Sequence, residues 1–223
     1  MEKLVFFGDS NVYGFGLGGK WDEDWSNGPH PLGWANVLCT IRNATGRNLS
    51  KPGSSNLEIM WTMLNAKIDP DEKIIVQWSF WNRDCILNNE VIQIRPNIIQ
   101  HDEKKYSENY YRVHTNIDMQ RRNWLIINHA LLWLKQQSNY FLMLGNGRGK
   151  IDGHSSVASG ILEIIKENLF IDANDREIVE STDKLIKYFY SDCFRDYAQD
   201  GIHFGPETNI TWANMLNNAI PKK

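Results

Sequence analysis

The chain has 223 residues, a mass of 25.9 kDa, a formal net charge of -3 and a sequence pI near 6.1. Proteins that bind nucleic acid or an anionic membrane surface usually carry a net positive charge, so this net charge argues against both kinds of partner. Its 3 cysteines include no C-x-x-C pair, so we expect free thiols rather than a disulfide scaffold or a zinc site. No stretch is long and apolar enough for a signal peptide or a membrane span, which predicts a cytoplasmic or virion-associated protein.

Strand and helix patterns alternate along the chain. In chain order, the expected elements are a strand at 3–7, a helix at 31–40, an extended segment at 48–50, a helix at 56–66, a strand at 73–79, a helix at 118–137, a strand at 140–144 and a helix at 206–219. Strands that are apolar on both faces and alternate with helices predict an α/β fold, a three-layer α/β/α sandwich with a central, mainly parallel sheet. We expect one domain over 1–223, with loop insertions around 84–115 and 145–175.

Three polar segments follow the ends of expected strands or precede the last helix. The first strand runs into Gly8-Asp9-Ser10-Asn11, a turn that would place Ser10 at the start of a helix, where backbone N–H groups favour negative charge. Near the other end of the chain, Asp200-Gly201-Ile202-His203 precedes the final helix. A serine, a histidine base and a carboxylate are the components of a hydrolytic triad. In parallel sheets, ligands bind at the carboxyl ends of the strands, which is where Ser10, Gly53 and the segment after Ser79 lie.

Each motif has a simpler interpretation when it is taken alone. Asp9-Ser10-Asn11 could be only a helix cap, and Gly53 after Pro52 could be only a type II turn. Asp200-Gly201 is also a common turn signal. The placement of these motifs at the two ends of one α/β pattern favours the catalytic interpretation.

A glycine-rich segment at 14–19 fits the G-x-G-x-x-G pattern of dinucleotide-binding proteins. That motif requires a strand directly before it and a helix that opens within it, and neither is expected here. We therefore expect a mobile loop at the mouth of the site, which would carry Trp21 and Trp25. The histidines outside the motifs lack metal-ligand spacing, so neither a metal ion nor a cofactor is predicted.

Together, these motifs resemble the sequence blocks of the SGNH (GDSL-type) hydrolases. Gly8-Asp9-Ser10 matches the first block, residues 49–56 with Gly53 resemble the second, and Asp200-x-x-His203 matches the last. The resemblance implies that His203 takes a proton from Ser10 while Asp200 orients the imidazole. It also implies an oxyanion hole made of the backbone N–H groups of Ser10 and Gly53 with the Asn82 side chain.

The third block departs from the family pattern. The family usually has Gly-x-Asn-Asp at this position, whereas this chain has Phe80-Trp81-Asn82-Arg83. Either Asn82 serves the oxyanion hole, or it is a surface residue and Arg83 or a backbone N–H donates instead. Asp9, Trp81 and Arg83 are the candidate substrate-binding residues.

The resemblance implies a serine esterase that acts on small acyl esters, in particular O-acetyl esters, with carbohydrate as the expected alcohol part of the ester. Aromatic side chains in polar loops suit the apolar faces of sugar rings; they are Trp21, Trp25, Trp81, Tyr106, Tyr110 and Tyr111. The alternatives are a glycan-binding module that has lost catalysis, a lipase or thioesterase, and an acyltransferase. Because a pure binding module needs none of Ser10, Asp200 and His203, their presence together argues for an enzyme.

Overall fold

A computed structural model describes residues 1–18, 28–80, 82–87, 90–95, 101–137, 141–144 and 195–220. Its main sheet has four strands in the order β2-β1-β3-β6, and all neighbouring pairs are parallel. The strands are β1 (Lys3–Phe7), β2 (Thr45–Asn48), β3 (Glu72–Gln77) and β6 (Phe141–Leu144). The two apolar strands β1 and β3 lie side by side in the middle of the sheet, because each has buried residues on both faces.

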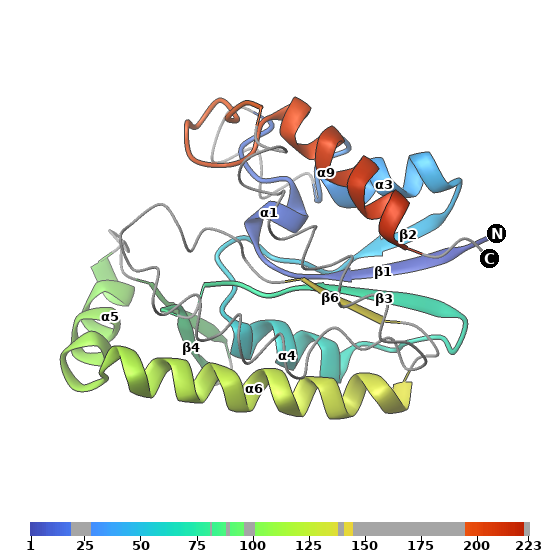
Figure 1. The fold of residues 1–223 in the computed structure, drawn as a ribbon. Coiled ribbons are helices and arrows are strands. Elements are labelled where there is room, and N and C mark those ends of the chain that lie inside the picture. The colour runs from blue at the N-terminus through green and yellow to red at the C-terminus, as the bar shows by residue number, and fades with distance from the viewer. Residues whose placement is uncertain are drawn as a thin grey trace.

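Two hydrophobic cores lie on opposite faces of this sheet, and alternate residues of β1 supply both. Leu4 and Phe6 belong to a core that includes residues of α3 (Trp34–Arg42) and α9 (Pro206–Ala219). Val5 and Phe7 belong to a second core with α4 (Asn56–Asn65) and α6 (Asn116–Gln137). Figure 1 shows the sheet between these two layers of helices. The predicted α/β/α sandwich with a mainly parallel sheet is therefore confirmed.

Capping residues set the starts of several helices. Ser55 Oγ accepts a hydrogen bond from the Glu58 N–H at 3.2 Å, and α9 begins with a proline directly after Gly205. The helix expected at 31–40 begins later, at Trp34, because the Trp34 N–H is bound by Asn209 Oδ1 of α9 at 2.9 Å. The extended segment expected at 48–50 corresponds to β2, which begins earlier, at Thr45, and ends at Asn48.

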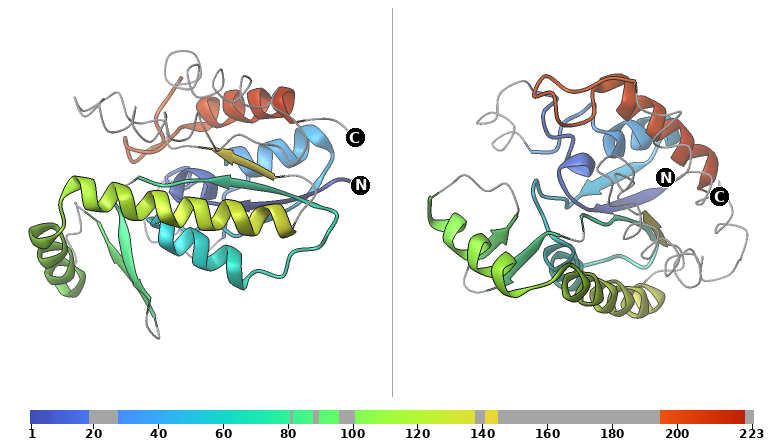
Figure 2. Two further views of the ribbon diagram at one scale, coloured as in Figure 1. Left: turned by 60° about the horizontal axis from the view of Figure 1, so that its bottom comes forward. Right: turned by 60° about the vertical axis from the view of Figure 1, so that its left-hand side comes forward.

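The predicted insertion around 84–115 contains ordered elements that the sequence did not indicate. Strands β4 (Asp84–Leu87) and β5 (Val91–Ile94) form an antiparallel hairpin, and α5 (His101–Val113) follows it. Figure 2 shows this hairpin and α5 extending to one side of the main sheet. The predicted insertion at 145–175 lies outside the described residues.

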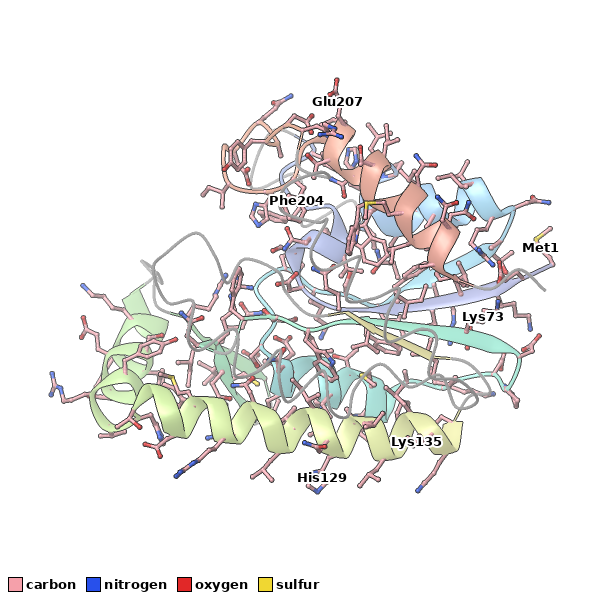
Figure 3. The ribbon with its side chains drawn as sticks, viewed as in Figure 1. Met1, Lys73, His129, Lys135, Phe204 and Glu207 are labelled. Carbon is pink, nitrogen blue, oxygen red and sulfur yellow. The ribbon has the colours of Figure 1, made fainter. Side chains whose placement is uncertain are left out.

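α4 and α6 each have a buried face and an exposed face. In α4, Ile59 and Met63 are buried, whereas Trp61 and Leu64 are 48% and 46% exposed. His129 and Lys135 point away from the sheet on the outer face of α6, as Figure 3 shows. Cys39 and Cys85 are free thiols, and Cys193 lies outside the described residues. None of the described helices combines the length and the apolar character needed to cross a membrane.

Candidate functional site

Ser10 is the first residue of the short helix α1 (Ser10–Tyr13), and two residues, Gly8 and Asp9, separate it from the end of β1. Asp9 caps this helix, since its Oδ1 accepts the Asn11 N–H at 3.0 Å. The helix ends at Tyr13 and is capped by Gly14, which has a left-handed backbone. This tight strand–turn–helix connection buries the Ser10 side chain at the carboxyl edge of the sheet.

His203 and Asp200 reach Ser10 from the loop before α9. The His203 Nε2 atom lies 3.0 Å from Ser10 Oγ, and His203 Nδ1 lies 2.5 Å from Asp200 Oδ2. The other carboxylate oxygen of Asp200 accepts the backbone N–H groups of Ile202 at 2.9 Å and of His203 at 3.0 Å. These distances form a continuous chain of hydrogen bonds from Ser10 through His203 to Asp200.

The loop that carries Asp200 and His203 is held in place at both ends. The Ala198 N–H donates to the His203 carbonyl at 2.8 Å, and Tyr197 forms an antiparallel bridge with Phe204. Phe204, labelled in Figure 3, belongs to the same core as Val12 of α1. The loop is therefore anchored in the core that also fixes the Ser10 helix.

The environment keeps Asp200 charged. Burial alone would raise the pKa of this carboxyl group, but hydrogen bonds from the backbone and ring of His203 and from the Ile202 N–H outweigh burial and lower it. A carboxylate in this position fixes the His203 ring with its Nδ1–H toward Asp200. The Nε2 lone pair is then directed at Ser10 Oγ, as general-base chemistry requires.

The glycine-rich segment packs behind this chain of hydrogen bonds. Phe15 is buried, and its ring meets the His203 ring edge to face at 5.3 Å between centroids. A Cβ atom on Gly16 would lie 2.6 Å from Asp200 Oδ2. Residues 14–16 of the expected loop are buried and form a packed wall beside Asp200 and His203, while Trp21 and Trp25 lie outside the described residues.

The segment before Gly53 runs beside the turn that carries Ser10. The Leu49 N–H donates to the Phe6 carbonyl at 2.8 Å, and the Lys51 N–H donates to the Gly8 carbonyl at 3.2 Å. Gly53 follows in a left-handed conformation with a φ of +79°. Within the described ranges, neither the Ser10 N–H nor the Gly53 N–H has a hydrogen-bond acceptor, although both residues are buried. The structure therefore offers two backbone donors on neighbouring segments.

The third predicted oxyanion donor, Asn82, lies in the loop after β3. Its backbone carbonyl accepts the Tyr111 hydroxyl at 2.5 Å, and its side chain is partly exposed. Trp81, which the sequence grouped with the substrate-binding residues, lies outside the described residues.

Asp9 and Arg83 form a buried polar network with Ser79. Asp9 Oδ2 accepts hydrogen bonds from Ser79 Oγ at 3.1 Å and from Arg83 Nη1 at 3.3 Å. Asp9 is 0% exposed, and its hydrogen bonds stabilise the turn that carries Ser10. Its contact with a substrate stays a prediction.

Sequence reasoning missed a second part of this network. Asn56 brackets Ser79, because its Oδ1 accepts the Ser79 N–H at 2.6 Å and its Nδ2 donates to the Ser79 carbonyl at 3.3 Å. Asn56 Nδ2 also reaches Asn123 Oδ1 at 2.6 Å, which ties α4 to α6. The signal that could have found it is the position of Asn56, which is the last residue of the block (residues 49–56) that contains Gly53.

A cavity of about 340 Å³ lies at the same end of the molecule, between the β4–β5 hairpin, α5 and α6. Tyr106, Tyr110 and His114 contribute to its lining, and Tyr106 is 47% exposed. The Tyr110 hydroxyl donates to Asp84 Oδ2 at 2.6 Å. In Figure 1, α5 and the hairpin lie at the same end of the sheet as α1 and the loop before α9. No group of three or more His, Cys, Asp and Glu side chains that could hold a metal ion occurs in the described part of the chain.

Comparisons with known proteins show what this fold resembles. No family model and no curated protein matches the sequence. Among solved structures, an acetyl xylan esterase (Est2A) from the rumen bacterium Butyrivibrio proteoclasticus matches with a TM-score of 0.56 and 15% identity, over 97% of this chain and 63% of that one. The lipase Lip_vut3 from a goat rumen metagenome matches with a TM-score of 0.56 and 14% identity, over 98% and 97%.

A family two carbohydrate esterase from Clostridium thermocellum, solved in complex with cellohexaose, matches with a TM-score of 0.52 and 10% identity. The match covers 97% of this chain and 62% of that esterase, so this chain spans less than two thirds of either carbohydrate esterase. At these identities the likeness is one of fold. The chain has the fold of the SGNH (GDSL-type) hydrolases, as the sequence motifs predicted.

Proposed function

We propose that this protein is a serine esterase that hydrolyses small acyl esters, in particular O-acetyl esters on carbohydrate. The observation that carries the proposal is the chain of hydrogen bonds from Ser10 Oγ to His203 Nε2 and from His203 Nδ1 to Asp200 Oδ2. A serine with a histidine base that is itself oriented by a carboxylate is the arrangement of an activated nucleophile.

The reaction follows from the roles of these three residues. His203 Nε2 accepts the Ser10 proton as Oγ attacks the ester carbonyl, and Asp200 stabilises the imidazolium that forms. Collapse of the tetrahedral intermediate breaks the bond to the alcohol, which receives the proton from His203 and leaves an acyl-Ser10. A water molecule, deprotonated by His203, then attacks this acyl group, which leaves as the carboxylic acid.

The backbone N–H groups of Ser10 and Gly53 bind the oxyanion of both tetrahedral intermediates. Each is buried and has no acceptor in the described part of the chain, so each can donate to a developing negative charge. Asn82 is the third donor in this proposal, since it follows β3 at the same edge of the sheet. One such donor contributes roughly 10²–10³-fold to the rate.

Carbohydrate is the proposed alcohol part of the ester for two reasons. Two of the solved structures with this fold are an acetyl xylan esterase and a carbohydrate esterase in complex with cellohexaose. The exposed Tyr106 ring also borders a cavity at the carboxyl end of the sheet, and such a surface suits the apolar face of a sugar ring. The substrate contacts predicted for Trp81 and Arg83 belong to the same proposal.

The test is hydrolysis of p-nitrophenyl acetate by the wild type and by Ser10→Ala and His203→Ala. Each variant should lose roughly 10⁴-fold in rate or more while it keeps the wild-type circular dichroism spectrum. His129→Ala is the matched histidine control, because this side chain lies on the exposed face of α6 and should leave the rate unchanged.

Comparison with a longer-chain ester separates an acetylesterase from a lipase. Comparison of acetylated with deacetylated xylooligosaccharides tests whether carbohydrate forms the alcohol part of the substrate. Wild-type turnover that persists in Ser10→Ala would contradict the proposal. Glycan binding without any turnover would favour a binding module that has lost catalysis.

A further inference from the structure

The β4–β5 hairpin contacts the loop that carries Gly53. Gln93 of β5 donates from Nε2 to the Pro52 carbonyl oxygen at 3.2 Å and to Glu58 Oε2 at 3.1 Å. Glu58 lies in the first turn of α4 and is buried. One side-chain amide therefore connects the hairpin, the loop and the start of α4.

The Pro52 carbonyl and the Gly53 N–H belong to the same peptide group. No cis peptide bonds occur in the described residues, so the Pro52 oxygen and the Gly53 Cα lie on one edge of this peptide plane and the Gly53 N–H lies on the other. A Cβ atom on Gly53 would lie 2.5 Å from Gln93 Oε1 and 2.6 Å from Arg95 Nη1. The side chains of Gln93 and Arg95 thus cover the side of the peptide that carries the Pro52 oxygen and the Gly53 Cα. The Gly53 N–H points away from them.

We propose that Gln93 is a positioning residue that fixes the orientation of the Pro52–Gly53 peptide, so that the Gly53 N–H is held ready for the oxyanion. This inference rests on the esterase function proposed above. A glycine at a φ of +79° has little intrinsic restraint, because it populates both signs of φ readily. Rotation of the peptide would break the Gln93–Pro52 hydrogen bond, which therefore limits that freedom.

The same hydrogen bond also strengthens the donor. A hydrogen bond to the carbonyl oxygen polarises the peptide group and makes its N–H more positive, an effect that increases in a buried site. Glu58 in turn holds the Gln93 amide, so that the carboxamide cannot easily rotate away from Pro52. The hairpin thus supports the oxyanion hole from outside the sequence blocks that carry the nucleophile.

The kinetic test compares three variants on p-nitrophenyl acetate. Gln93→Met keeps a similar volume but removes the donor, and we expect kcat to fall about 10- to 100-fold with KM changed less than about twofold. Gln93→Lys restores an N–H donor near Pro52 and Glu58 and should keep most of the wild-type kcat. Ile92→Ala is the matched control, because its side chain lies on the opposite face of β5 and should leave kcat unchanged.

The affinity of a boronic acid that mimics the tetrahedral intermediate should fall with kcat in Gln93→Met. A kcat for Gln93→Met equal to that of the wild type would overturn the proposal. An equal loss in Ile92→Ala would also overturn it, since the effect would then come from the fold of the hairpin.

A second measurement separates this inference from the esterase proposal. The ¹⁵N–¹H resonance of Gly53 reports the orientation and polarisation of its peptide group without any turnover. We expect this resonance to shift in Gln93→Met and to stay near the wild-type position in Gln93→Lys and Ile92→Ala. An unshifted resonance in Gln93→Met would overturn the positioning role even if Ser10-dependent hydrolysis is found. A shifted resonance in a protein without hydrolysis would contradict only the esterase function.

Discussion

Gly16 packs directly against the carboxylate of Asp200, and the space between them cannot hold a side chain. A Cβ atom on Gly16 would lie 2.6 Å from Asp200 Oδ2 and 3.1 Å from Oδ1. Gly16 also has a φ of +87°, which side chains disfavour. Because Asp200 in turn holds His203, the wall formed by residues 14–16 sets the position of the proposed base.

Gly16→Ala should therefore impair catalysis more than stability. The new methyl group displaces the Asp200 carboxylate, and we expect kcat to fall about 10- to 100-fold. The left-handed backbone adds a loss of about 1–2 kcal/mol in the free energy of unfolding. Hydrolysis of p-nitrophenyl acetate and urea unfolding measure the two effects.

Gly28→Ala is the control for backbone strain. Gly28 has a φ of +73°, but a Cβ atom there meets nothing within 4 Å. This variant shares the strain and lacks the clash with Asp200, so its kcat should match the wild type. Equal kcat values for the two alanine variants would show that the contact with Asp200 is unimportant.

The Asp9–Arg83 ion pair stabilises the turn that carries Ser10. Arg83 Nη1 lies 3.3 Å from Asp9 Oδ2, and the Asp9 side chain has no exposed surface. Arg83→Met removes a charged partner from a buried carboxylate and should lower the free energy of unfolding by about 2 kcal/mol.

A double-mutant cycle tests whether the two charges depend on each other. Asp9→Asn in the Arg83→Met background removes the uncompensated charge and should cost less than Asp9→Asn alone. Urea unfolding of the four proteins gives the coupling energy. Additive effects would mean that this ion pair contributes nothing specific to the turn.

The fold could be predicted where each element carries its own signals. β1 and α9 have the bounds expected from the sequence, because β1 is a continuous apolar run and α9 begins at a proline after a glycine. α5 was missed because its sequence, HDEKKYSENYYRV, consists mostly of polar and charged residues, so that its few apolar residues do not stand out as a core-facing segment. The contact of Trp34 with Asn209 that sets the start of α3 joins residues 175 apart, so no local pattern encodes it.

The residues of the candidate site also fall into two groups, those that short sequence motifs identify and those that only contacts between distant segments identify. Ser10, Asp200 and His203 could be named from short motifs, and the structure brings them within hydrogen-bond distance. Gly16 and Gln93 could not, because their importance lies in which distant residue each one touches. Gly16 meets Asp200 from the opposite end of the chain, and Gln93 meets Pro52 across 41 positions.

Tyr106 is the residue through which the carbohydrate proposal can be tested. Its ring is 47% exposed and borders the cavity beside α5. Tyr106→Ala should raise KM for acetylated xylooligosaccharides about 3- to 10-fold, as expected when a stacking contact is lost. Its effect on p-nitrophenyl acetate, which has no sugar ring, should be much smaller. The same change in KM for both substrates would argue against sugar stacking at Tyr106.

Glu2 lies directly before β1, at the end of the sheet opposite the proposed site. Its ionisation makes the stability of the protein depend on pH. The hydrogen bond from Arg42, opposed by burial and aided by Lys73, lowers the pKa of Glu2 from 4.5 to about 2. Its Oε2 lies 2.7 Å from Arg42 Nε, and its Oε1 lies 2.7 Å from Lys73 Nζ. A carboxyl group with a lowered pKa in the folded state contributes stability above its unfolded pKa. That contribution is lost as the pH falls through the folded value.

The wild type should therefore lose stability between about pH 5 and pH 2, with a contribution from Glu2 of about 3 kcal/mol. Glu2→Gln cannot titrate, so it should be less stable than the wild type at pH 7. Because that contribution is already absent in the variant, the difference between the two proteins should narrow toward pH 2. Urea unfolding at a series of pH values measures both curves. Parallel curves over this range would show that Glu2 does not have the lowered pKa that its contacts with Arg42 and Lys73 imply.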